Sequence, residues 1–162
     1  MRSGVLAVLL LAGAAAHAAE LQRRGEGTLR WFGLKVYEAT LRTEGAAPEF
    51  TQRFTLELRY ARALRGAAIA QRSHEEIARL GFGTPAQREI WRAAMGRLFP
   101  DVAAGDTLTG EHLPGRGARF LRNGRALGEI ADPEFARAFF SIWLDPRTSA
   151  PDLRAALLGG GS

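Results

Sequence analysis

Strand-like and helix-like hydrophobic patterns occur in separate runs along this chain, and their order constrains the fold more than any other feature. Two strand-like runs are followed by a helical region at residues 66–99, three further strand-like runs, and a helical region at the C-terminus. Segregated runs of this kind are typical of α+β proteins, in which helices cover one face of an antiparallel sheet. We therefore predict an α+β fold. The strand-like runs are Leu29–Leu41, Phe54–Tyr60, Thr107–Leu113, Ala118–Arg122 and Arg125–Ile130.

The strand predictions depend on residue composition and alternation. In Phe54–Tyr60 apolar and polar residues alternate strictly, which is typical of a strand with one buried face. The run Leu29–Leu41 is rich in aromatic and β-branched residues, and we predict one long strand bent at Gly33. Asn123 and Gly124 separate two strand-like runs, and they predict a type I′ hairpin because both tolerate a positive φ.

Capping residues mark the ends of the expected helices. Thr84 is the predicted N-cap of the second helix in the 66–99 region. Asp132 followed by Pro133 predicts the start of a third helix, with large aromatic residues at helical spacing. Ser149 is expected to cap the last helix, which ends at Gly159. The apolar stripe of the third helix, expected to be core, consists of Phe135, Phe139, Ile142 and Trp143.

The N-terminus has the features of a secretory signal peptide. Arg2 is followed by the apolar run Val5–Ala12 and by the small-residue cleavage pattern at residues 16–18. The apolar run is shorter than the ~20 residues that span a membrane. We predict a signal peptide at residues 1–19, cleaved after Ala18 or Ala19, a single domain at 20–159, and a disordered tail at 160–162. The mature protein is then expected to be periplasmic or secreted, with no stable membrane span.

Composition argues against several classes of function. The chain has no cysteine, and His74 and His112 are the histidines beyond the signal region, so no metal and no cofactor is expected. Ser73 and His74 are adjacent on a predicted helix, which does not suit a catalytic triad. Arg30 stands where a dinucleotide fingerprint beginning at Gly25 would need its third glycine. The 22 basic residues are scattered among 17 acidic ones, so we expect no nucleic-acid partner.

Arg30 is the candidate functional residue. In one regular strand it would share a face with Phe32, Leu34 and Val36, and a guanidinium on an apolar face requires a partner. One interpretation is a salt bridge within the protein, or an exposed strand end from which Arg30 reaches water. The other is an anion-binding arginine at the rim of an apolar ligand pocket. Tyr60 is then a second ligand-binding candidate through its hydroxyl, or else an edge of the core.

Six segments carry a resemblance to known proteins: Lys35–Leu41, Leu56–Tyr60, Ser73–Ile77, Phe99–Gly110, Phe120–Gly124 and Phe139–Ser149. Together they resemble exported bacterial proteins of the chalcone isomerase-like family. The resemblance covers nearly the whole chain after the signal region, and the segment beginning at Phe139 is its most specific part.

The resemblance implies an open-faced β-sandwich, in which a helical layer packs on a large antiparallel sheet with a ligand cleft between them. The wider family includes plant enzymes that close a chalcone to a flavanone, and relatives that bind fatty acids without catalysis. In both, an arginine on an early strand holds an oxyanion or carboxylate. Arg30 is the candidate counterpart here, with Arg23 and Arg24 as alternatives. The Tyr and Asn that support isomerisation in the plant enzymes are absent from residues 65–73.

Three functional hypotheses follow. The first is a non-catalytic binder of a lipophilic acid such as a fatty acid, held by Arg30 and Tyr60, with no catalytic residue. The second is an intramolecular lyase acting on a chalcone-like enone, in which the same arginine would hold a developing oxyanion. The third is an interaction protein whose cleft is filled by its own side chains.

Overall fold

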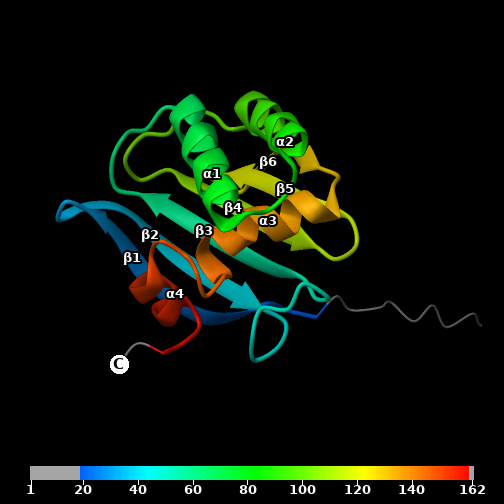
Figure 1. Ribbon diagram of the computed structural model, residues 1–162. Helices are drawn as coiled ribbons and strands as arrows, with labels where there is room; N and C mark the ends of the chain where they lie inside the picture. The colour runs from blue at the N-terminus through cyan, green and yellow to red at the C-terminus, as the bar shows by residue number, and fades with distance from the viewer. Residues whose placement is uncertain (1–18, 161–162) are drawn as a thin grey trace, which may run out of the picture.

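The computed structural model describes residues 19–160, which form one antiparallel sheet with four helices packed against it (Figure 1). The six strands lie in sequence order, each hydrogen-bonded to the next. The predicted α+β architecture is confirmed. The strands are β1 (Gln22–Trp31), β2 (Leu34–Thr43), β3 (Phe54–Tyr60), β4 (Thr107–Leu113), β5 (Gly117–Arg122) and β6 (Arg125–Ile130). The helices are α1 (Gly66–Leu80), α2 (Pro85–Leu98), α3 (Pro133–Leu144) and α4 (Pro151–Leu157).

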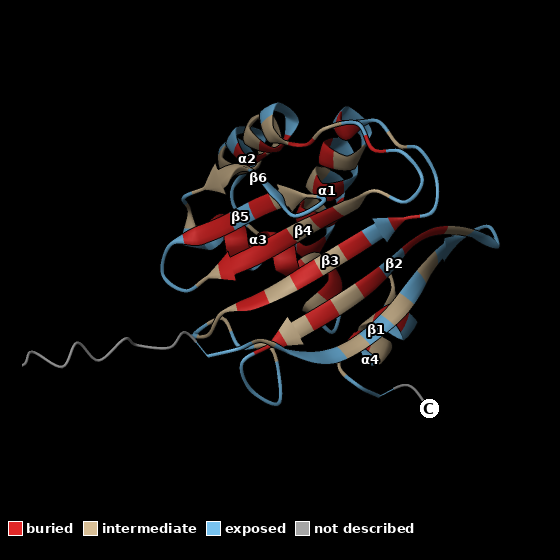
Figure 2. Ribbon diagram, turned by 180° about the vertical axis from the view of Figure 1, so that it is seen from behind, coloured by how far each residue is buried: buried red, intermediate tan, exposed pale blue. Residues whose placement is uncertain are grey.

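The helices make different contacts with the sheet. Helix α3 packs on β5, and α4 packs on β1 and β2. Helix α1 packs mainly against α2 and α3, so it stands off the central strands. Seen from behind, the sheet presents its other face without a helical layer (Figure 2). Within residues 19–160, no helix combines the length and the apolar character needed to cross a bilayer. The predicted signal peptide, apart from Ala19, and the last two residues of the predicted tail lie outside the described residues.

The prediction of one strand from Leu29 to Leu41 is wrong, because the chain reverses within it. Strands β1 and β2 form a hairpin whose turn residues, Phe32 and Gly33, have φ values of 48° and 76°. Two consecutive positive φ angles make this a type I′ turn, where Asn-Gly is favoured and a phenylalanine is unusual. The turn could therefore not be predicted from residue types, because phenylalanine at position 32 does not indicate one. The hairpin predicted at Asn123-Gly124 is confirmed, with φ values of 49° and 79°.

Helix α3 anchors the core, and its predicted start at Asp132 is confirmed. One carboxylate oxygen of Asp132 accepts hydrogen bonds from the backbone N–H groups of Glu134 and Phe135 at 2.9 and 3.2 Å. The other accepts one from the indole N–H of Trp91 in α2 at 2.8 Å. Phe135 and Phe140 are fully buried. A single carboxylate thus caps α3 and joins it to α2.

Of the other two predicted N-caps, the one for α2 is confirmed and the one for α4 is wrong. Thr84 caps α2 as expected, in a reciprocal capping box with Gln87. Ser149 does not cap α4, whose N-cap is Ala150. Its hydroxyl instead donates to Glu76 in α1 at 2.9 Å, a partner that local sequence could not indicate.

Two glycines allow α4 to lie directly on β1. A Cβ at Gly25 would lie 2.2 Å from the carbonyl oxygen of Ala156, and one at Gly27 would lie 2.8 Å from a methyl group of Leu153. Both distances are shorter than van der Waals contact, and at Gly25 the opposing atoms belong to the backbone of α4. The approach of α4 therefore depends on the absence of side chains at these two positions of β1.

We expect Gly25→Ala to lower the free energy of unfolding by ~1–3 kcal/mol, because α4 must move away from β1. Gly96→Ala is the matched control, since a Cβ added at Gly96 in α2 would meet no atom within 4 Å beyond its chain neighbours and the backbone of its own helix. It should raise stability by ~0.5–1 kcal/mol through helix propensity. Urea unfolding of both variants measures the difference. Equal effects of the two substitutions would contradict the close packing of α4.

Candidate functional site

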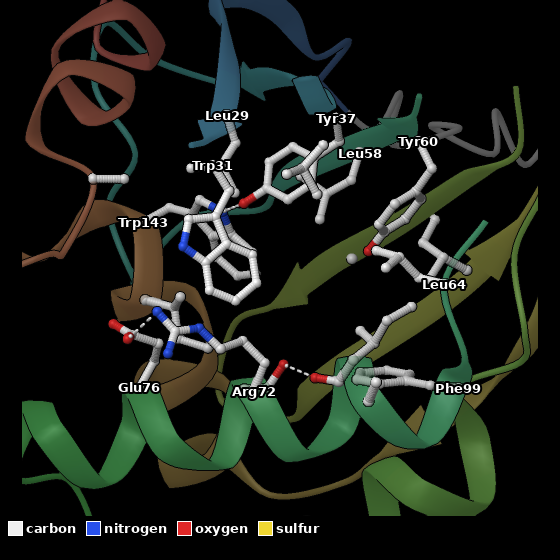
Figure 3. A pocket seen from close by; sticks show the side chains of 18 of the residues that line it. Leu29, Trp31, Tyr37, Leu58, Tyr60, Leu64, Arg72, Glu76, Phe99 and Trp143 are labelled. Atoms are coloured by element: carbon white, nitrogen blue, oxygen red, sulfur yellow. Dashed lines mark hydrogen bonds and ion pairs between the residues drawn. The ribbon is translucent and has the colours of Figure 1, made fainter. Parts of the chain in front are cut away.

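A cavity of about 780 Å³ lies between the sheet and the helices α1 and α3 (Figure 3). Its volume falls within the range of small-molecule binding sites. The deep part is built from apolar side chains of the sheet and of the helical layer, which Figure 3 shows on opposite sides of the space. The apolar lining includes Leu56, Leu58, Leu108, Phe99, Phe120, Phe139, Ile69 and Ile142.

Strand alternation produces this apolar wall. Leu56, Leu58 and Tyr60 point toward the cavity, whereas Glu57 and Arg59 line a polar groove elsewhere on the sheet. Successive side chains of a strand point to opposite faces, so the alternation in Phe54–Tyr60 sets both surfaces. The residues of β3 that face the helices could therefore be predicted from the sequence.

A hydrogen bond between Tyr37 and Trp143, which both line the cavity, joins the sheet to helix α3. The indole N–H of Trp143 in α3 donates to the hydroxyl of Tyr37 in β2 at 2.9 Å. Burial raises the pKa of Tyr37 to about 12, and the Trp143 hydrogen bond offsets part of this shift. The phenol thus stays neutral well above the pH at which an exposed tyrosine ionises. Trp143 was predicted from the sequence as a core residue, whereas Tyr37 was not selected.

Tyr60, the second ligand-binding candidate from the sequence, forms part of the same wall. Its side chain is 3% exposed and lies edge-to-face against Tyr37, with ring centroids 5.7 Å apart. Burial, together with the neighbouring Tyr37, raises the pKa of Tyr60 above its ordinary value. Among residues 19–160, no group hydrogen-bonds to the Tyr60 hydroxyl, which points into the cavity in Figure 3.

Arg30 lies at the rim of the cavity and not within its apolar wall. A register shift between Leu29 and Arg30 precedes the hairpin turn, and Arg30 is exposed while still lining the cavity. The expectation that it shares an apolar face with Phe32 assumed a continuous strand, and the turn removes that assumption. Its guanidinium makes a long hydrogen bond, 3.4 Å, to the carbonyl of Gly33. Arg30 and Tyr60 thus line one cavity, one at the rim and the other in the interior.

Arg23 and Arg24, the alternatives to Arg30, do not line the cavity. Arg23 is paired with Glu26 at 2.8 Å on the exposed part of β1. Arg24 is exposed, and its side chain lies near Gly159. Of the three arginines considered from sequence, Arg30 alone borders the cavity.

A buried carboxylate, Glu76, organises the charged end of the cavity, and it was not among the residues selected from the sequence. Glu76 in α1 is 5% exposed and accepts hydrogen bonds from Arg79 at 3.0 Å and Ser149 at 2.9 Å. Arg72, one turn earlier, forms an ion pair with it at 2.9 Å, drawn in Figure 3. The spacing of Arg72, Glu76 and Arg79 along one helix is a signal for such pairing, whereas the role of Ser149 depends on the fold.

The two histidines beyond the signal region contact different parts of the chain. His112 stacks on Phe54 with a centroid distance of 4.6 Å, and its Nδ1 lies 2.8 Å from the carbonyl of Gln52. Burial lowers the pKa of His112. His74 lies near the carbonyl of Arg88 in α2. Within the described part of the chain, no cluster of three or more His, Cys, Asp or Glu residues could hold a metal ion.

The sequence and the fold of this chain are both similar to those of known proteins. The family profile of chalcone isomerase-like proteins matches residues 7–159. The chain belongs to this family. No curated protein sequence matches the chain significantly. The solved structures that share this chalcone isomerase-like fold include an Arabidopsis thaliana fatty-acid binding protein, with a TM-score of 0.69 and 12% sequence identity over 85% of this chain and 86% of the other.

The two tyrosines of the chain provide a direct probe of the cavity, because both lie in its wall. We expect ultraviolet titration to show no tyrosinate at pH 10, the ordinary pKa, and ionisation of Tyr37 only near pH 12. Above pH 10 the native state then binds more protons than the unfolded chain, so stability falls as pH rises from 10 toward 12. A native-state midpoint at pH 10 would contradict the burial of both phenols.

Proposed function

We propose that this protein binds a lipophilic acid, such as a fatty acid, in the cavity between sheet and helices, without catalysing a reaction. One observation carries the proposal: the interior of the cavity is apolar, and its arginines lie on the exposed side. A molecule with an acyl chain and a carboxylate matches this arrangement, because it is apolar along its chain and anionic at one end. Apolar burial would hold the chain, and charge-assisted hydrogen bonds would hold the head group.

The charges at the rim favour Arg30 over Arg72 as the carboxylate partner. Arg30, Arg62 and Arg72 line the cavity together with Glu75 and Glu76. Arg72 already pairs with Glu76, which reduces its attraction for another anion. Within residues 19–160, Arg30 and Arg62 form no ion pair, and Arg30 has the weak contact to Gly33 as its side-chain hydrogen bond. A ligand carboxylate that binds Arg30 through two hydrogen bonds would therefore replace only this weak contact to Gly33.

Tyr60 is the proposed second polar contact. Its hydroxyl is a neutral donor over the physiological range, as the hydroxyl of any tyrosine is, and burial raises its pKa further. A carboxylate held by Arg30 at the rim does not by itself require Tyr60. A shorter acid that enters more deeply, or one with a second oxygen function along its chain, would reach the interior hydroxyl.

The composition of α1 favours binding over isomerisation. Helix α1 contains neither tyrosine nor asparagine, the residue types that the family resemblance assigns to support of isomerisation in this region. The open volume of the cavity does not favour an interaction protein with a filled cleft, since no side chain among residues 19–160 occupies it. The fold shared with the fatty-acid binding protein from Arabidopsis thaliana supports a ligand of this class.

We expect purified protein to bind a soluble fatty acid such as decanoate with one-to-one stoichiometry in native mass spectrometry and calorimetry. Arg30→Ala should weaken binding by ~2 kcal/mol, because a charge-assisted contact is lost. Arg97→Ala is the matched control, since Arg97 is exposed on α2 and does not line the cavity. No detectable binding to the unmutated protein would overturn the proposed function. Equal affinities of both variants would remove Arg30 from the site while leaving the cavity as the binding site.

Export is also part of the proposal. It is supported by the charged start, the short apolar run and the small-residue pattern that ends at Ala18. When the full chain is produced in a bacterium with a periplasm, we expect the intact mass of the periplasmic fraction to correspond to a chain that begins at Ala19 or Glu20. A chain that keeps Met1 and stays in the cytoplasmic fraction would contradict export.

A further inference from the structure

The tip of the β1–β2 hairpin exposes three large apolar side chains. Trp31, Phe32 and Leu34 are 64%, 92% and 55% exposed, and the Trp31 and Phe32 rings stack with centroids 5.8 Å apart. Figures 1 and 2 show the hairpin projecting beyond the helical layer. Within the described part of the chain, the remaining large apolar residue with comparable exposure is Ile90 in α2. Exposed apolar residues gathered at one projecting loop mark an interaction surface.

Phe32 has no role in folding that explains its place. Its φ of 48° is unfavourable for a residue with a bulky side chain, and its ring buries almost nothing. The same chain forms an equivalent turn differently at Asn123, whose φ of 49° precedes Gly124 as Phe32 precedes Gly33. Asparagine is the residue that favours this conformation. The aromatic ring at position 32 is therefore retained at a cost in local stability, which points to a role outside the fold.

Basic residues surround the exposed tip. Arg30 and Lys35 are paired across the hairpin, and the backbone N–H of Ala61 donates to the carbonyl of Val36, which brings the loop with Arg62 alongside. Residues 27–37 and 58–66 contain no aspartate or glutamate. Lys35 is partly neutralised by Glu38, whereas Arg30 and Arg62 form no ion pair within residues 19–160. The surface is thus apolar at its tip with a cationic collar, which complements an anionic lipid surface.

The tip also borders the opening of the cavity. Arg30, Trp31 and Arg62 line the cavity while their side chains are exposed, so its mouth opens beside the hairpin. A surface that entered the interface of a bilayer at Phe32 would bring the mouth to the depth of the head groups. Tryptophan and arginine are both suited to that depth.

We propose that the β1–β2 hairpin tip docks on an anionic lipid bilayer, with Phe32 and Trp31 in the interfacial region and Arg30 and Arg62 at the phosphates. Docking would let an amphiphile pass between the bilayer and the cavity without crossing water. This use of the surface depends on the proposed function, whereas docking itself does not. The two properties can therefore be tested separately.

The test uses flotation of the mature protein with vesicles of phosphatidylglycerol and phosphatidylcholine in equal parts, and with phosphatidylcholine vesicles alone. We expect the protein to float with the anionic vesicles and to lose this binding at high salt. Trp31 is exposed whereas Trp91 and Trp143 are 3% and 7% exposed, so a blue shift of tryptophan emission on binding reports the hairpin tip.

Phe32→Asn is the decisive variant, because it creates the same Asn-Gly turn that the chain already uses at Asn123-Gly124 and should not unfold the protein. It should lower partitioning onto anionic vesicles by about tenfold or more, as expected for removing one buried phenyl ring. Ile90→Gln, which removes an exposed apolar residue from α2, is the control and should leave partitioning unchanged.

Several outcomes would overturn docking. They are failure of the unmutated protein to float, equal loss in both variants, and unchanged binding of Phe32→Asn. A concentration-dependent dimer that Phe32→Asn abolishes, without vesicle binding, would assign the tip to a second copy of the chain instead.

Decanoate binding without vesicles separates the two proposals. Phe32→Asn should retain it, and the absence of decanoate binding in the unmutated protein would count against the cavity ligand alone.

Discussion

The buried carboxylate of Glu76 fixes the C-terminal part of α1 within the helical layer. It joins α1 to the segment after α3 through Ser149, and Arg79 adds a second link by donating to the carbonyl of Arg147 at 3.0 Å. At its other end α1 is fixed by the backbone N–H of Gly66, which donates to Asp101 at 2.8 Å. A buried carboxylate is tolerated when its partners are complete, and removing one partner leaves a costly unpaired charge. The position of α1 therefore depends on polar contacts at its two ends in addition to its packing against α2 and α3.

This way of holding α1 explains why a cavity exists. Apolar packing against the sheet would draw a helix onto the strands, as it does for α3 through Phe135 and Phe140. Helix α1 is secured instead by helices and loops, so its middle does not reach β3 and β4. The space that remains is walled by aliphatic and aromatic groups from both layers. The shape of the cavity therefore follows from the placement of α1.

Local sequence patterns predicted much of the fold and less of the site. Alternation in β3, the Asn123-Gly124 turn and the Asp132 cap are properties of neighbouring residues, and each was predicted correctly. The Phe32-Gly33 turn was missed because Phe32 adopts a backbone conformation that its residue type disfavours. The contact between Ser149 and Glu76 joins residues 73 positions apart, so spacing could not suggest it. Arg30 and Tyr60 were selected by residue chemistry, and their separation within the cavity depended on the missed turn.

Strand β1 lies at one edge of the sheet, with its outer backbone groups unpaired by another strand of the described chain. Edge strands of this length invite pairing with other molecules, and inserted charges are a common protection. Arg23, Arg24 and Glu26 lie along β1 and are exposed. The arginines that do not border the cavity thus discourage strand addition. A protein that carries a hydrophobic hairpin tip at the end of an open edge needs this protection, because the same strand that displays the aromatic side chains could otherwise start an aggregate.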